Sequence, residues 1–174
     1  MNISVREFIR TATLFEQIQA NSFAHRFGVT LESLPQSRGI VGDYIITSVT
    51  EQSLELQDKV GPLLNRKIEF KNDKTSLKYN SFFVEYESTS NFWNSKFESG
   101  HQKAISENCL LCMNSGRDVY IFNEESFAEM CTYSIGVKQT KFRSNGNMPG
   151  SRTKGMIIPL KDARVCASFV YRMP

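Results

Sequence analysis

The spacing of apolar side chains predicts a helix at the start of the chain and a strand after it. From residue 3 to residue 20, apolar residues recur every three or four positions, which is typical of an amphipathic helix. Ser4 followed by Glu7 has the pattern of a capping box at the start of this helix. Residues 35–39 predict a loop, and residues 40–49, rich in β-branched and aromatic side chains, predict a strand.

Further strands and helices follow in the rest of the chain. The later strands are expected over 67–71, 81–86, 118–122 and 156–160, and the later helices over 101–113 and 124–131. This order of elements predicts an α/β domain with a mixed central β-sheet flanked by helices. The length of 174 residues is that of one domain, so we expect residues 1–174 to share one fold.

The composition adds expectations about location. No run of 18 apolar residues occurs, so no membrane-spanning helix is expected. Charges at Arg6, Glu7 and Arg10 stand where a signal peptide would be apolar. Four cysteines in a chain with ample apolar residues do not resemble the disulfide framework of a small secreted domain. We therefore expect a cytoplasmic protein in a reducing compartment.

Several common site chemistries find little support in the sequence. Cys109 and Cys112 form a C-x-x-C pair with no second pair nearby, which favours buried cysteines over a structural zinc site. His25 and His101 are not accompanied by a nucleophile in a motif of the triad hydrolases. A glycine-rich phosphate loop of the P-loop or Rossmann type is also missing, which argues against a nucleotide-dependent enzyme.

The basic residues gather near the C-terminus. From Lys138 onward there are eight basic residues and one acidic residue, whereas the preceding 137 residues carry 13 basic and 17 acidic residues. Residues 138–155 contain few apolar side chains, so we expect a mobile loop that contacts the phosphates of a nucleic acid. The candidate contact residues are Lys138, Lys141, Arg143, Arg152 and Lys154. A basic surface loop without a partner is the alternative.

Glu69 and Lys71 suggest a catalytic pair. An acid and a lysine two positions apart on a strand share one face, about 7 Å apart. Two carboxylates that hold Mg²⁺ beside a lysine can hydrolyse a phosphodiester, because the metal neutralises charge on the phosphate and the lysine orients the attacking water. Asp58, eleven residues before Glu69, would supply the second carboxylate. A solvent-facing charge pair is the alternative interpretation of Glu69 and Lys71.

This arrangement of Asp58, the Glu69-x-Lys71 strand and the strand 81–86 resembles the PD-(D/E)xK nuclease family, in particular its phage-encoded and recombination-type members. The resemblance implies a restriction-endonuclease-like fold and the hydrolysis of phosphodiester bonds in nucleic acid, with DNA favoured, using Mg²⁺ or Mn²⁺. It implies that Asp58 and Glu69 hold the metal and that Lys71 positions the attacking water. Glu16, on the preceding helix, would complete the metal shell.

Some alternatives stay open at this point. If residues 54–60 form a strand, Asp58 shares a face with its apolar residues, and Asp43 or Asp73 would be the first acid instead. Glu85, on the strand after the Glu69-x-Lys71 strand, is a candidate additional acid. The same fold would also suit a non-catalytic module that binds nucleic acid or protein, and a homodimer is compatible with both functions.

Overall fold

The computed structural model describes six segments of the chain. These segments are residues 5–35, 42–90, 95–97, 109–137, 142–145 and 151–174. The first elements are α1 (Val5–Phe27), β1 (Val29–Ser33), β2 (Tyr44–Val49), the 3-10 helix η1 (Glu51–Ser53), α2 (Leu54–Val60), β3 (Lys67–Asn72) and α3 (Ser76–Tyr79). The later elements are β4 (Ser81–Ser90), β5 (Ser95–Phe97), β6 (Leu110–Ser115), β7 (Asp118–Phe122), α5 (Glu124–Val137), β8 (Phe142–Asn145), β9 (Ser151–Pro159), α6 (Leu160–Cys166) and β10 (Phe169–Arg172).

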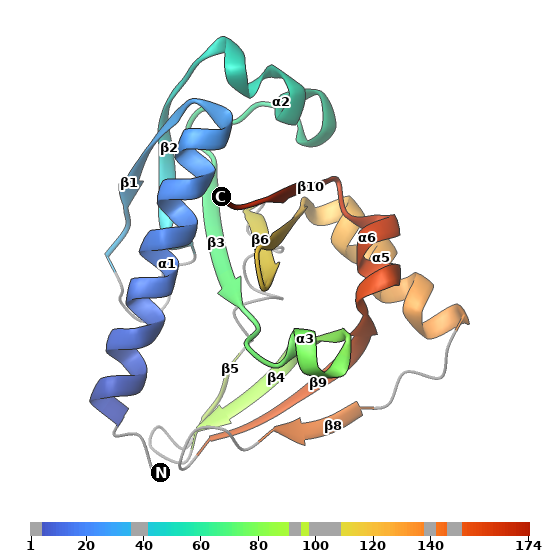
Figure 1. Cartoon of the computed structure of the whole chain (residues 1–174). Coiled ribbons are helices and arrows are strands. Elements are labelled where there is room, and N and C mark those ends of the chain that lie inside the picture. Colours follow the sequence, from blue (N-terminus) through green and yellow to red (C-terminus); the bar gives the residue numbers. More distant parts are fainter. Residues whose placement is uncertain (1–4, 36–41, 91–94, 98–108, 138–141, 146–150) are drawn as a thin grey trace.

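A six-stranded mixed sheet forms the centre of the fold. The strand order is β1-β2-β3-β6-β7-β10, in which β3 and β6 are parallel and the other neighbours are antiparallel. The long helix α1 runs beside β1, β2 and β3, and α5 and α6 lie on the other side of the fold (Figure 1). This architecture confirms the predicted α/β class with a mixed central sheet flanked by helices.

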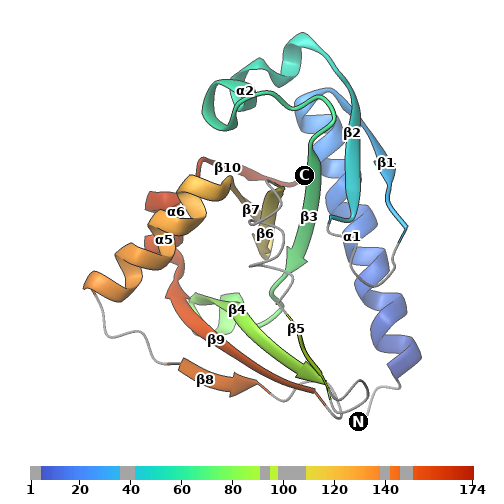
Figure 2. The ribbon, with the colours of Figure 1, turned by 180° about the vertical axis from the view of Figure 1, so that it is seen from behind.

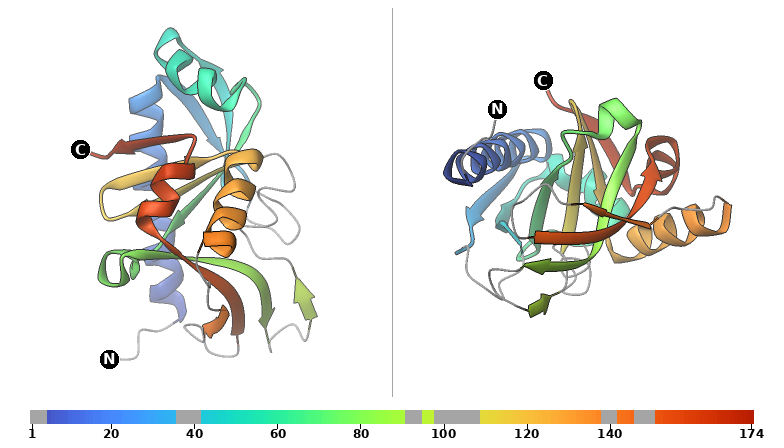
Figure 3. Two further views of the ribbon diagram at one scale, coloured as in Figure 1. Left: turned by 90° about the vertical axis from the view of Figure 1, so that its right-hand side faces the viewer. Right: turned by 90° about the horizontal axis from the view of Figure 1, so that it is seen from below.

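A second, smaller sheet continues from the first. Its order is β5-β4-β9-β8, and all of its neighbours are antiparallel. The chain passes from β3 through α3 into β4, so β3 and the smaller sheet are connected directly (Figure 2). The smaller sheet lies at the end of the molecule opposite α2 (Figure 3).

Alternating side chains of the central strands build two cores. On the face covered by α1, Phe23 and Phe27 pack with Ile68 and Phe70 of β3, and none of the four is more than 2% exposed. On the opposite face, apolar side chains of β6 and β7, such as Leu111, pack against β4, β9, α5 and α6. The even-numbered side chains of β3 therefore face α1, and its odd-numbered side chains face away from α1.

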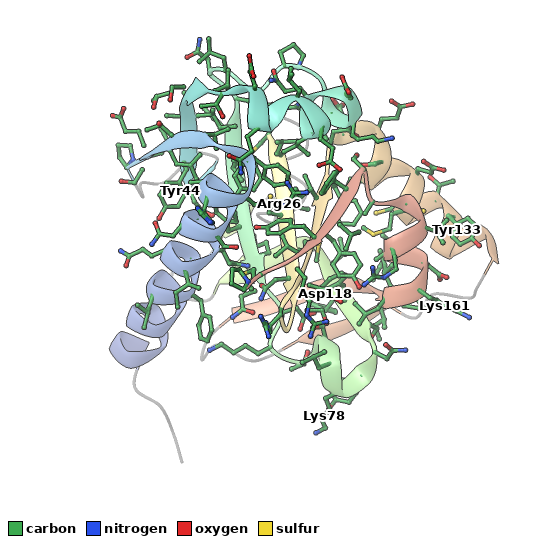
Figure 4. All side chains as sticks on the ribbon, turned by 45° about the horizontal axis from the view of Figure 1, so that its top comes forward. Arg26, Tyr44, Lys78, Asp118, Tyr133 and Lys161 are labelled. Carbon is green, nitrogen blue, oxygen red and sulfur yellow. The ribbon has the colours of Figure 1, made fainter. Side chains whose placement is uncertain are left out.

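Two groups of charged side chains connect elements at the surface. The guanidinium group of Arg26 lies 5.6 Å from the ring centre of Phe169 on β10 and makes an ion pair of 3.1 Å with Glu55 on α2 (Figure 4). Asp118, at the start of β7, makes an ion pair of 3.0 Å with Arg164 on α6 (Figure 4). These pairs link α1 to α2 and β7 to α6, and exposed pairs of this kind add little stability.

Several sequence predictions match the observed elements. The strands expected over 67–71, 81–86 and 118–122 correspond to β3, β4 and β7, and the helix expected over 124–131 corresponds to the first part of α5. Within the described segments, no helix combines the length and the apolar character needed to cross a membrane.

Other predictions are corrected by the structure. The helix expected over 101–113 is wrong for residues 110–113, which belong to β6, and residues 101–108 lie outside the described segments. Every residue of β6 is buried, so its sequence lacks the polar-apolar alternation of a half-exposed strand. The expected mobile loop over 138–155 contains β8 and the first residues of β9, so these parts are strands.

Candidate functional site

β3 carries Glu69 and Lys71 on the face opposite α1. Ile68 and Phe70 are buried against α1, and the alternation of the strand places Glu69 and Lys71 on its other face. There, Lys71 Nζ lies 2.7 Å from Glu69 Oε1. Glu69 is the more buried partner, with 13% of its side chain exposed against 31% for Lys71. The two side chains thus meet on one face, as their spacing predicts.

Asp43 joins this pair from the start of the neighbouring strand β2. Its N–H donates to the carbonyl oxygen of Ile68 at 2.7 Å, and its Oδ2 accepts a hydrogen bond of 2.7 Å from the N–H of Phe70. The preceding residue, Gly42, donates its N–H to Glu69 Oε2 at 3.1 Å. The pairing of β2 with β3 therefore brings the Asp43 and Glu69 side chains together, and only 7% of Asp43 remains exposed.

Gly42 stands at a close approach between the two strands. Its φ of +91° lies in a region that residues with a Cβ rarely adopt. A Cβ at this position would lie 3.1 Å from Cβ of Lys67, which is tighter than ordinary packing. Because the N–H of Gly42 donates to Glu69, the glycine also helps to fix the orientation of the Glu69 carboxylate.

Glu16 approaches the site from α1. Burial raises the pKa of Glu16 from its ordinary value, while attraction to Lys71 opposes this shift and repulsion by Glu69 adds to it. Glu16 is therefore close enough to interact electrostatically with both charged side chains of β3. The helix acid expected from the sequence thus lies near the pair formed by Glu69 and Lys71.

The environment of Asp43 disfavours its charged form. Burial, followed by repulsion from Glu69, raises the pKa of Asp43 to about 7, and Glu16 adds a smaller contribution. The N–H of Phe70 and the ammonium group of Lys71 act in the opposite direction. The site thus gathers three carboxyl groups around one ammonium group. A divalent cation would neutralise this excess of negative charge.

The donor set of the site suits Mg²⁺ or Mn²⁺, because both ions prefer carboxylate oxygens. In the segments that the structure describes, no three His, Cys, Asp or Glu side chains are arranged as the ligands of one ion. Asp43 Oδ2 and both carboxylate oxygens of Glu69 are already engaged with Phe70, Gly42 and Lys71. The carboxylate of Glu69 would therefore have to turn away from at least one partner to bind a metal.

Asp58, expected from the sequence as the first acid, lies elsewhere. It is exposed on α2, whose buried side is formed by Leu56 and Val60. Asp43 and α2 lie at opposite ends of β2, which spans about 20 Å for six residues. Residues 54–60 form a helix rather than a strand, and this corrects the prediction that Asp58 joins Glu69 and Lys71. Asp43, the sequence alternative, occupies that position.

Asp73 and Glu85 also lie in other surroundings. The Asp73 carboxylate accepts hydrogen bonds of 2.9 Å from the N–H groups of Thr75 and Phe83, so it holds the turn from β3 to β4. Glu85 lies on β4 and stands opposite Gly155 of β9. β4 pairs with β9 and β5 and is not a neighbour of β3 in either sheet, which corrects the expectation that Glu85 lies on an adjacent strand.

The basic residues predicted to contact nucleic acid fall partly within the smaller sheet. Arg143 lies on β8, and Arg152 and Lys154 lie on the neighbouring strand β9. Lys138 and Lys141 lie outside the described residues. The backbone positions of the three described residues therefore belong to a paired sheet rather than to an open loop.

The sequence prediction underrated Asp43 and missed Gly42. The signal that could have found both is a Gly-Asp pair at the start of the β-branched strand that precedes the Glu69-x-Lys71 strand. The prediction that Cys109 is a buried cysteine is confirmed, but its nearness to the acids was not expected. Burial, together with the charges of Glu69 and Asp43, raises the pKa of its thiol.

The chain was also compared with known proteins. The comparisons with protein-family models, with curated proteins and with solved structures gave no match. The function therefore has to be argued from the geometry and the electrostatics of the site.

Proposed function

We propose that this protein is a metal-dependent nuclease that hydrolyses phosphodiester bonds in nucleic acid, with DNA as the favoured substrate. The observation that carries the proposal is the meeting of Asp43, Glu69 and Lys71 on two paired strands, with Glu16 of α1 close enough to interact electrostatically with Glu69 and Lys71. An isolated surface ion pair would not need a third, largely buried carboxyl group beside it. Buried groups with strongly shifted pKa values are typical of functional sites.

The roles of the residues follow from their positions. Asp43, Glu69 and Glu16 would hold Mg²⁺ or Mn²⁺ after their side chains rearrange, with the Glu69 carboxylate turning away from Gly42, and the ion would neutralise charge on the phosphate. Lys71 is held by Glu69 at 2.7 Å, so its ammonium group has a fixed direction from which it orients the attacking water. Before a metal binds, Gly42 orients the carboxylate of Glu69 by donating its N–H.

The order of these residues along the chain supports the resemblance to the PD-(D/E)xK family. An acid opens one strand, the Glu69-x-Lys71 pair lies on the next strand, and a further acid lies on the helix that precedes both. In this chain these positions are Asp43 before β2, Glu69 and Lys71 on β3, and Glu16 on α1. The members it resembles act on DNA inside cells, so we place the activity in the cytoplasm, in a phage-encoded or recombination-type role.

Nucleic acid is the substrate class that the charge distribution favours. The region from Lys138 to the C-terminus has eight basic residues and one acidic residue. Arg152 and Lys154 lie two residues apart on β9 and share one face of the sheet, from which they could contact successive phosphates. Arg143 pairs with Gly155 and so stands at a position of the other face. A homodimer would present two such sheets to one nucleic acid.

The proposal is tested by incubating the purified protein with Mg²⁺ or Mn²⁺ and labelled single-stranded, duplex and branched DNA, and with RNA of matching sequence. Cleavage is expected for the wild type and should be lost in Lys71→Ala and in Asp43→Asn. Asp58→Asn is the matched control, because it makes the same change on the exposed face of α2 and should retain full activity. Equal activity in Asp43→Asn and Asp58→Asn, or an active Lys71→Ala variant, would refute the assignment.

The second candidate is a non-catalytic module that binds nucleic acid or protein. The observation that favours it is the engagement of both Glu69 oxygens by Gly42 and Lys71. Calorimetric titration with Mn²⁺ separates the two candidates. A nuclease site should take up the ion and lose this uptake in Glu69→Gln, whereas a module without chemistry should take up none.

A further inference from the structure

A cavity of about 820 Å³ lies beside the candidate site. One wall is the turn between α2 and β3, and the other wall is the start of α5. This size falls in the range of cavities that hold small organic ligands. The site residues described above use Lys67 only as a packing partner of Gly42, and they make no use of the rest of this cavity.

The cavity and the carboxylates share one face of β3. Lys67 lines the cavity and lies two residues before Glu69, so the two side chains leave the strand on the same side, about 7 Å apart. Gly42 lies between them, since it packs against Cβ of Lys67 and donates its N–H to Glu69. A ligand in the cavity would therefore lie next to any group that is bound at the carboxylates.

Cys109 supports this placement. Its buried thiol interacts electrostatically with the acids Glu69 and Asp43 and also with the basic residues Arg66 and Lys67. Arg66 and Lys67 both line the cavity. The acidic site and the basic wall of the cavity thus border the same buried side chain.

The walls of the cavity combine the groups that a nucleotide requires. Leu64, which is 52% exposed, and Pro62 offer apolar surface to the face of a base. Asn65 adds an amide that can pair with the edge of a base. Arg66 and Lys67 add positive charge for a phosphate on the side nearest to Glu69. The opposite wall carries Glu124 and Glu125, whose carboxylates can accept hydrogen bonds from the amino group of a base.

We propose that this cavity receives an unpaired nucleotide next to the bond that is cut, so that the substrate is nucleic acid that is single-stranded at the cleavage site. This inference rests on the proposed nuclease function. The cavity is a recess bounded on two sides, by the turn before β3 and by the start of α5, so a base would have to point out of its strand to fill it. A base within a duplex would first have to leave its stack in order to enter.

Binding measurements in the Lys71→Ala background, in Mg²⁺, test the inference without any cleavage. The probes are a fluorescein-labelled single strand of eight nucleotides and the blunt duplex of the same sequence, followed by fluorescence anisotropy. Ala128→Trp, which fills the cavity from α5, should weaken binding of the single strand at least tenfold, whereas Glu129→Trp, its exposed neighbour, should not. Lys67→Gln should reduce the magnitude of the slope of log K against log salt concentration by about 0.7, where K is the association constant for the single strand. Lys59→Gln, on α2, should leave this slope unchanged.

The inference is overturned if Ala128→Trp binds the single strand as tightly as Glu129→Trp does, with both variants folded by circular dichroism. It is also overturned if the blunt duplex binds as tightly as the single strand. A wild-type protein that cuts no nucleic acid in Mg²⁺ or Mn²⁺ would refute the nuclease function separately. The binding comparison would still decide whether the cavity holds an unpaired nucleotide.

Discussion

Replacing Asp43 by Asn should stabilise the metal-free protein at alkaline pH. Asp43 is only 7% exposed, and burial together with repulsion from Glu69 raises its pKa to about 7. The protonated form is therefore favoured in the folded state. The stability that this form provides is complete below the ordinary pKa of 3.8 and is lost as the pH rises through about 7.

The size of the effect follows from the same shift. A rise from 3.8 to about 7 corresponds to at most about 4 kcal/mol between acidic and alkaline pH. The Asn amide does not ionise, and its oxygen can still accept the hydrogen bond from Phe70. The variant should also relieve the repulsion that Asp43 exerts on Glu16 and Glu69. We expect Asp43→Asn to gain about 1 to 4 kcal/mol over the wild type between pH 4.5 and pH 8.

Urea unfolding followed by circular dichroism, in EDTA at pH 4.5, 6, 7 and 8, measures this difference. Asp58→Asn is the control, because an exposed substitution on α2 should stay within about 0.5 kcal/mol of the wild type at every pH. The reasoning would be refuted if the difference in free energy of unfolding between Asp43→Asn and the wild type did not change with pH. It would also be refuted if the advantage of Asp43→Asn over the wild type were smaller at pH 8 than at pH 4.5.

Three further predictions concern the same part of the molecule. Mn²⁺ at a hundredfold excess over its dissociation constant should stabilise the wild type at pH 8 by about 2.7 kcal/mol in thermal unfolding and should have no such effect on Asp43→Asn. Gly42→Ala should cost about 1 to 3 kcal/mol in urea unfolding, because of the positive φ and the 3.1 Å approach to Lys67, and a stability equal to the wild type would show that the turn can relax. Phe23→Ala should cost about 3 to 5 kcal/mol, because Phe23 is fully buried and packs on Phe70 at 6.0 Å between ring centres, and a loss below 1 kcal/mol would contradict this packing.

The sequence predicted β3 and its charged pair well. The alternation over 67–71 distinguishes a strand with one apolar face, and the structure places Ile68 and Phe70 inside the core as that pattern requires. Glu69 and Lys71 meet because of this periodicity alone. Glu16 was named from the family resemblance, and its position beside β3 depends on how α1 packs, which the spacing of its residues does not determine.

The prediction from the sequence was wrong where the same residue pattern fits both a strand and a helix. Residues 54–60 are too short for periodicity to separate a strand from a helix, and in the structure Leu56 and Val60 bury one side of a helix. The spacing of apolar residues predicted the helix α1 correctly, but Phe15 and Ile18 of this stripe are 38% and 48% exposed. Among the side chains of α1 that the structure describes, those that pack in the core begin at Ala20 and centre on Phe23.

The hydrogen bond from the N–H of Phe83 to Asp73 joins the end of β3 to the start of β4. Asp73 follows Lys71 by two residues, and α3, which comes next, is held to β6 by an oxygen-to-oxygen contact of 2.8 Å between Ser76 and Ser115. The turn between the two sheets is therefore bonded both to β4, through Asp73, and to β6, through Ser76. Asp73 and Ser76 thus anchor the turn at which the chain leaves the six-stranded sheet for the four-stranded one, so a substitution at either residue would change how β4 is oriented relative to β3.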